Sequence, residues 1–131
     1  MELIRLAIVI VAAGVLASFT DWLFMGVINH KLYEQHPEVW REGRQERNKI
    51  IVSTLWGALG SAAFAALGYR LGVHGVVDWL LSAVLVWAAG PAPLLAMNVV
   101  WMKFPAGLGH SHAAGWLARF VITGLLAALI L

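Results

Sequence analysis

Long apolar runs separated by short polar connections dominate the chain. Four such runs cover about residues 3–28, 50–71, 76–102 and 112–131. Each is long enough to cross a hydrocarbon core of about 30 Å, because a helix rises about 1.5 Å per residue. The runs are continuous rather than alternating, which argues against transmembrane β-strands. The pattern therefore predicts an all-α integral membrane four-helix bundle, built as a single transmembrane domain over residues 1–131.

The first connection is the longest polar stretch. It covers residues 31–49 and reads KLYEQHPEVWREGRQERNK. Pro37 suits the first position of a helix, where its missing N–H group is not needed. Tyr33 and Trp40 are amphipathic rings of the kind that gather at the headgroup level of a membrane. We therefore expect a short interfacial helix in this first loop.

The later connections are short and rich in glycine or proline. Residues 68–75 predict a tight turn, and residues 103–111 predict an irregular loop. Inside the third apolar run, the sequence Gly90-Pro91-Ala92-Pro93 places two prolines in the middle of the span. A proline removes a backbone donor and kinks a helix. Broken helices line binding sites in transporters, and kinked helices that only pack are the alternative interpretation.

Charged residues are scarce and unevenly distributed. They make up 12% of the chain, against roughly 25% in an ordinary soluble domain. Seven of the nine Lys and Arg residues lie on the side of the first and third connections: Lys31, Arg41, Arg44, Arg47, Lys49, Lys103 and Arg119. Such an excess marks the cytoplasmic side, so both termini are expected on the opposite side of the membrane. Anionic lipids account for the clustering better than nucleic acid, which is not expected as a partner.

Asp21 is the most informative polar residue, because a carboxylate at membrane depth is costly and needs a partner. It lies about two turns inside the first span, and Arg119 lies about two turns inside the fourth, on the same side. We expect the two side chains to pair. Asn98 lies near the same end of the third span and either packs against a helix or lines the same polar centre. Asp21, Arg119 and Asn98 are the candidate catalytic or pathway residues, and a purely structural ion pair is the alternative.

Histidines form a second group at the same predicted end of the bundle. The residues that could ligate a metal there are His30, Glu34, His36, His110 and His112. Imidazole and carboxylate together suit zinc, nickel or copper. The chain has no cysteine, and the histidine spacing matches no dedicated metal motif, so loop histidines at the headgroup level are the simpler interpretation. No cofactor is predicted, and a divalent metal is the alternative.

Small residues recur every four positions along the second span, at Ser53, Gly57 and Ser61. A row of this kind lets two helices approach each other closely. The neighbouring helix belongs either to the bundle interior or to a second copy in a homo-oligomer, and the sequence does not choose between them. Membrane lipids are the other expected partner.

Two segments carry a resemblance to a known family. The first span ends in a polar break with tryptophan, Asp21-Trp22-Leu23-Phe24-Met25-Gly26. The third span contains Trp87-Ala88-Ala89-Gly90-Pro91, followed by Asn98. In these segments and in its length, the chain resembles the bacterial four-span membrane proteins of domain-of-unknown-function family 1761. The resemblance implies four spans in a bacterial inner membrane, so the outward-facing termini are expected in the periplasm, and it brings no established activity.

Function is poorly constrained by the sequence. No Walker loop, Gly-x-Ser-x-Gly elbow, His-Glu-x-x-His motif or dinucleotide fingerprint is present, so the chemistry of conventional soluble enzymes has no support. The leading hypothesis is a small polytopic membrane protein with a structural, regulatory or interaction-based role. One alternative is a small proton-coupled transporter that uses Asp21. A second is a membrane enzyme acting on a lipid or isoprenoid, with Asp21 or a histidine in acid–base roles.

Overall fold

The computed structural model describes residues 1–40 and 46–131, and this part of the chain is helical without any strand. Its principal helices are α1 (Glu2–Asp21), extended by the π-helix η1 (Trp22–Ile28), then α3 (Glu46–Leu71), α4 (Val76–Ala89), α5 (Pro91–Trp101) and α6 (Ala106–Ile130). Four helical stretches are long and apolar enough to cross a membrane, with α4 and α5 together forming the third. The predicted all-α four-helix bundle is confirmed, and the chain is a multi-pass membrane protein.

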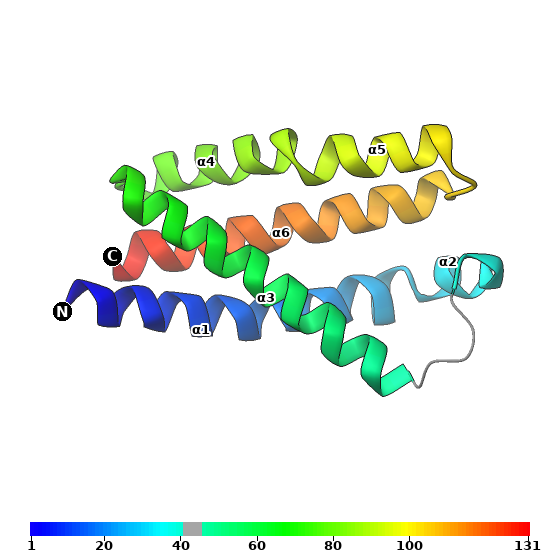
Figure 1. Cartoon of the computed structure of the whole chain (residues 1–131), viewed down its shortest axis with the longest axis horizontal. Helices are drawn as coiled ribbons and strands as arrows, with labels where there is room; N and C mark the ends of the chain where they lie inside the picture. Colours follow the sequence, from blue (N-terminus) through cyan, green and yellow to red (C-terminus); the bar gives the residue numbers. More distant parts are fainter. Residues whose placement is uncertain (41–45) are drawn as a thin grey trace.

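The helix α6 lies at the centre of the bundle. It packs against α1, α3, α4 and α5. Figure 1 shows α6 between α1 on one side and the α4–α5 span on the other, with α3 crossing obliquely. Both termini lie at one end of the molecule, called here the terminal end, and the connections α1–α3 and α5–α6 lie at the opposite end, called the loop end. Different faces of α6 therefore contact each of the other three spans.

A tightly packed core occupies the terminal end. The Trp79 side chain is 1% exposed, and its ring meets Phe64 edge-on at a centroid distance of 5.7 Å. Two glycines make room for it: a Cβ at Gly68 would overlap the Trp79 ring, and one at Gly124 would lie 3.2 Å from the Trp79 carbonyl oxygen. The absence of side chains at these two positions lets α3 approach the Trp79 ring and α6 approach the backbone of α4 at Trp79.

The third span is broken at Gly90, where φ is −126° and ψ is −86°. The helix α4 ends one residue earlier, and α5 begins at Pro91. Pro91 and Pro93 therefore fall in the first turn of a new helix, whose N–H groups have no acceptor within the helix in any case. The Gly-Pro-Ala-Pro sequence, for which a kink is expected, coincides with an interruption of the helix at the single residue Gly90.

The fourth span begins at Ala106, six residues before the start expected at residue 112. Pro105 has extended backbone angles and stands immediately before the helix. Gly107 and Gly109 weaken a helix in isolation, but here they allow close packing. A Cβ at Gly109 would lie 2.7 Å from Cγ2 of Val99, and one at Gly107 would lie 3.1 Å from Leu32. Packing against other helices therefore makes residues 106–111 helical, although the sequence predicts an irregular loop over residues 103–111.

The first connection contains two short helical segments, α2 (His30–Glu34) and the 3-10 helix η2 (Pro37–Val39). Pro37 occupies the first position of η2, as expected. Tyr33 is buried, and its ring stacks on Trp40 at 5.3 Å, while the Trp40 indole N–H donates to the Tyr33 carbonyl at 3.2 Å. Residues 41–45 of the predicted interfacial helix lie outside the described residues.

Candidate functional site

The helix geometry changes at Asp21. This residue ends α1, and the following seven residues form the π-helix η1. The Asn29 side chain closes η1 by donating its Nδ2 hydrogen to the Phe24 carbonyl at 3.0 Å. π-helical turns are rare and occur frequently at functional sites. A π-helix has more residues per turn than an α-helix. The side chains after Asp21 therefore point in other directions than they would in a continuous α-helix.

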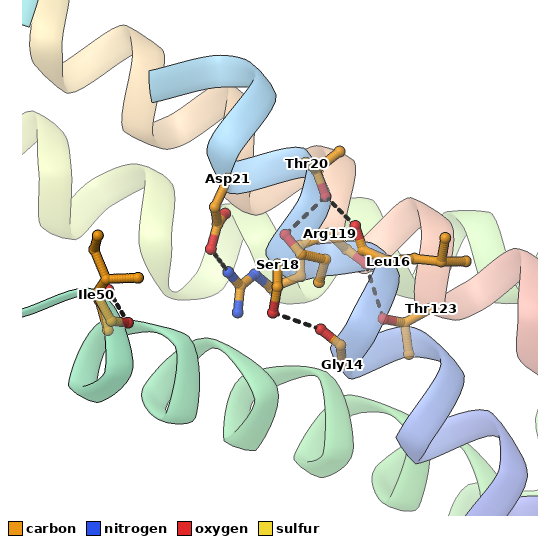
Figure 2. Close-up of polar contacts among 10 residues, drawn as sticks. Gly14, Leu16, Ser18, Thr20, Asp21, Ile50, Arg119 and Thr123 are labelled. Atoms are coloured by element: carbon orange, nitrogen blue, oxygen red, sulfur yellow. Dashed lines mark hydrogen bonds and ion pairs between the residues drawn. The ribbon is translucent and has the colours of Figure 1, made fainter. Parts of the chain in front are cut away.

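Asp21 and Arg119 form an ion pair inside the membrane-spanning region. Nη2 of Arg119 donates to Oδ2 of Asp21. The Arg119 side chain is 4% exposed and that of Asp21 is 29% exposed. Figure 2 shows the guanidinium reaching from α6 to the carboxylate at the end of α1. The predicted pairing is present, and it joins the first span to the central helix.

The small residues of α3 provide the space for this pair. A Cβ at Gly57 would overlap the guanidinium of Arg119, and a Cβ at Gly60 would lie 2.8 Å from the Trp116 ring. The Arg119 guanidinium carbon also lies over the Trp116 ring, 4.8 Å from its centroid, within the range of a cation–π contact. The glycine-containing face of α3 therefore packs against the Arg119 guanidinium and the Trp116 ring of α6.

The three residues of the predicted small-residue row differ in environment. Gly57 and Ser61 are buried within the chain, whereas Ser53 is exposed and donates to the Ile50 carbonyl at 2.9 Å. The Ser61 hydroxyl has no hydrogen-bond partner among the described residues. Gly57 therefore faces the interior of the bundle, which is one of the two alternatives that the sequence left open. A homo-oligomer formed through this row stays a prediction.

Arg119 is incompletely satisfied. Its Nε and Nη1 atoms are fully enclosed and have no hydrogen-bond partner in the part of the chain that the structure describes. A buried donor without an acceptor costs roughly 1–3 kcal/mol, and more when it is charged. The Asp21 carboxylate therefore meets only part of the hydrogen-bonding capacity of this side chain.

A cavity of about 330 Å³ adjoins the ion pair. It lies between the α1–η1 span, α3 and α6, and its lining residues are Asp21, Phe24, Met25, Ser53, Trp56, Gly57, Ser111, His112, Gly115, Trp116 and Arg119. Its large apolar side chains are Phe24, Met25, Trp56 and Trp116, and polar or charged side chains converge on the same space. Ligand sites usually combine these two properties.

A hydrogen-bonded group at Ser111 lies on the side of the cavity that faces the loop end. The Ser111 hydroxyl accepts from Nδ2 of Asn29 at 2.8 Å and from the Tyr33 hydroxyl at 3.2 Å. Burial raises the pKa of the Tyr33 hydroxyl above its ordinary value, so the phenol stays protonated and remains a donor. His112 meets the Tyr33 ring edge-on at a centroid distance of 5.7 Å. These contacts attach the first connection to the start of α6.

The remaining predicted site residues are dispersed. His30 pairs with Glu34 at 3.1 Å on one exposed turn, His36 pairs with Glu38 at 3.0 Å, and His110 is exposed. Within residues 1–40 and 46–131, no three His, Cys, Asp or Glu side chains gather closely enough to hold a metal ion. Of the five predicted metal ligands, His112 alone lines the cavity.

Asn98 is half-buried on α5 and is not part of the described lining of this cavity. The structure therefore brings together two of the three candidate residues, Asp21 and Arg119, and adds others that the sequence did not single out. Ser111 and Trp116 are the main additions. Ser111 lies eight residues and Trp116 three residues before Arg119, about two turns and one turn of helix, and these spacings are the signal that could have found them.

A second cavity, of about 350 Å³, lies at the terminal end. Arg5 and Arg70, the two basic residues expected on the periplasmic side, both line it. The Tyr69 hydroxyl donates to the Glu2 carboxylate there at 3.0 Å. This arrangement links the start of α1 to the end of α3.

The fold and the site define a multi-pass helical membrane protein with an intramembrane ion pair beside a cavity at one end of the bundle. No protein-family model, curated protein or solved structure matches the chain. The resemblance to domain-of-unknown-function family 1761 stays a prediction.

Proposed function

We propose that this chain is a small polytopic membrane protein with a structural, regulatory or interaction-based role, whose spans are held in register by the Asp21–Arg119 pair. The observation that carries the proposal is the place of this pair. It joins the first span to α6, the helix that contacts all the others. A carboxylate and a guanidinium in a low-dielectric region interact strongly and leave few alternative arrangements of the two helices.

The proposed location is a bacterial inner membrane with both termini in the periplasm. Lys31, Lys49 and Lys103 belong to the loop end, and Arg5 and Arg70 belong to the terminal end. The larger number of basic residues at the loop end supports a cytoplasmic position for that end. The resemblance to domain-of-unknown-function family 1761 is the reason for proposing a bacterial membrane, and a homo-oligomer is part of the same proposal.

The test of the proposal is Asp21→Asn, with thermal unfolding measured in dodecyl maltoside. Removing one partner of a buried ion pair costs roughly 3–5 kcal/mol, and less where a carboxylate is partly exposed, as Asp21 is. Thr20→Val is the matched control, because the Thr20 hydroxyl bonds only to carbonyls of its own helix. We expect a lower melting temperature for Asp21→Asn alone. Equal melting temperatures for both variants would contradict the structural role.

The cavity favours a second candidate function, transport or lipid chemistry. Asp21 borders a space that also contains Ser111 and His112, so its carboxylate is near an imidazole and a hydroxyl. A proton-coupled exporter would have to release Asp21 from Arg119 in each cycle. Proton-driven uptake of a lipophilic cation into proteoliposomes tests this candidate, since Asp21→Asn would abolish uptake while the protein remains folded.

A further inference from the structure

Two arginines from distant parts of the chain meet at the terminal end of the bundle. Arg5 lies near the start of α1 and Arg70 in the last turn of α3, and both line the cavity of about 350 Å³. Among the described residues, no other Lys or Arg belongs to this end of the molecule. The end that carries few basic residues therefore has both of them at one cavity.

Both guanidinium groups are accessible. Arg5 and Arg70 are exposed, and within residues 1–40 and 46–131 neither side chain forms an ion pair or a hydrogen bond. The carboxylate of Glu2 lines the same cavity, but it accepts from the Tyr69 hydroxyl at 3.0 Å. The N–H donors of the two arginines are therefore available to a molecule that enters the cavity.

The polar side chains around this cavity favour an anion. Two guanidinium groups outnumber the single side-chain carboxylate, that of Glu2, and His74 adds an imidazole. A Cβ at Gly72 would lie 3.9 Å from Nε2 of His74, so the imidazole lies close to the turn that follows Arg70. The planar fork of a guanidinium matches the paired oxygens of a phosphate group.

The cavity lies at the level where the four spans end. Each span contributes a residue from its terminal-end turn: Glu2, Arg70, Trp79 and Leu131. Phospholipid phosphates lie at this level of a bilayer, and basic pockets between membrane helices bind lipid headgroups. Ile4 and Leu71, which adjoin the two arginines in sequence, are 66% and 71% exposed. Apolar surface for acyl chains is therefore present beside the guanidinium groups.

We propose that the terminal-end cavity binds a phosphate group, whose oxygens accept hydrogen bonds from the guanidinium groups of Arg5 and Arg70. Two sources supply this chemistry, the phosphodiester of a membrane lipid and a soluble phosphate compound that enters from the water. The site shares no lining residue with the cavity beside the Asp21–Arg119 pair, so it is separate from the proposed structural role.

The experiment measures binding to the full chain, delipidated in dodecyl maltoside and freed of any purification tag, because Leu131 also lines the cavity. Isothermal titration uses dioctanoylphosphatidylglycerol as the lipid probe and glycerol phosphate as the soluble probe. Dioctanoylglycerol is the matched lipid without a phosphate. We expect saturable binding of at least one phosphate probe and none of dioctanoylglycerol. Tighter binding of the phosphatidylglycerol identifies a lipid, and binding of glycerol phosphate that is at least as tight identifies a soluble ligand.

Three substitutions connect binding to the cavity. Arg5→Gln and Arg70→Gln each remove a guanidinium group, and Glu2→Gln removes the carboxylate that competes with the ligand. We expect each arginine substitution to weaken binding by about tenfold, because hydrogen bonds to charged groups are strong. Glu2→Gln should bind the same probe more tightly than the wild type. Arg47→Gln removes the same group at the loop end and is the matched control, with unchanged affinity.

Several results would overturn this site. Dioctanoylglycerol binding as tightly as the phosphatidylglycerol would show that the phosphate is not recognised. Wild-type affinity in both Arg5→Gln and Arg70→Gln, or no saturable binding of either phosphate probe, would remove the site. An equal loss in Arg47→Gln would assign the affinity to the overall positive charge of the protein.

The melting temperatures of the two arginine variants separate a lost site from a lost fold. Both side chains are exposed and unpaired among the described residues, so each variant should melt with the wild type. The proposed structural role has a different measure, the melting temperature of Asp21→Asn, and its failure would leave phosphate binding unaffected.

Discussion

Gly57 and Arg119, on two different spans, occupy adjoining space so closely that a Cβ atom at residue 57 would overlap the guanidinium. Residue 57 of α3 must therefore be as small as glycine, because the Arg119 guanidinium of α6 occupies the neighbouring space. The glycine at this position also explains why the second span approaches α6 at the depth of the ion pair. The glycine is needed for space, since its backbone lies within a regular helix.

Gly57→Ala should therefore destabilise the bundle, although alanine is the better helix former. Overpacking a filled site costs about 1–3 kcal/mol, and we expect a correspondingly lower melting temperature in detergent. Gly115→Ala is the matched control, because a Cβ at that position meets nothing within 4 Å. A Gly57→Ala protein as stable as the wild type would show that α3 and α6 are farther apart than described.

Replacing both members of the ion pair should be less harmful than replacing one. Asp21→Asn leaves a buried guanidinium without its counter-charge, whereas the double variant Asp21→Asn with Arg119→Met leaves no buried charge. Apolar replacement of a whole buried pair is often neutral or stabilising. We expect the double variant to melt at a higher temperature than Asp21→Asn alone. Additive losses from the two substitutions would argue that the residues act independently.

Ser111→Ala should loosen the first connection with little effect on the spans. The substitution removes the acceptor used by both Asn29 and Tyr33, and each such bond contributes about 0.5–1.5 kcal/mol. We expect faster amide hydrogen exchange in α2, measured by mass spectrometry. Ser53→Ala is the control, since the Ser53 hydroxyl bonds only to Ile50 of its own helix. Unchanged exchange in α2 would mean that the Tyr33–Trp40 stack suffices to hold it.

Stability should fall at alkaline pH, in part because of Tyr33. Burial raises the pKa of its hydroxyl, so the folded protein holds this proton more tightly than the unfolded chain does. The contribution is complete below the ordinary tyrosine pKa near 10 and is lost as pH rises through the raised value. Melting temperatures between about pH 8 and 11 should therefore fall less steeply in Tyr33→Phe than in the wild type. Parallel curves would contradict this assignment.

The number of spans and the pairing of Asp21 with Arg119 could be predicted from the sequence. Continuous apolar runs require membrane helices, and two opposite charges at equal depth strongly favour each other in a low-dielectric region. Both inferences need only the residue types and the helix rise. Which helix packs against which face could not be predicted in this way, because the rotation of each helix about its own axis depends on packing. The place of Gly57 against Arg119 is an example.

The start of α6 and the group around Ser111 could not be predicted for a different reason. Gly107 and Gly109 read locally as loop residues, and their value in close packing appears only once Leu32 and Val99 are beside them. Ser111 likewise gained its role from Asn29 and Tyr33, which are about 80 positions away in the sequence. Contacts over such separations leave no periodic signal in a single chain.

The central position of α6 has a consequence for biogenesis. It is the last of the four spans to leave the ribosome, yet α1, α3, α4 and α5 all pack on it. The earlier spans are therefore synthesised before their common neighbour, and Asp21 remains without Arg119 until the fourth span follows. Membrane insertion machinery that retains early helices would shelter this carboxylate during the interval. The first two spans can pack on each other before α6 exists, but the bundle is complete only when α6 joins them.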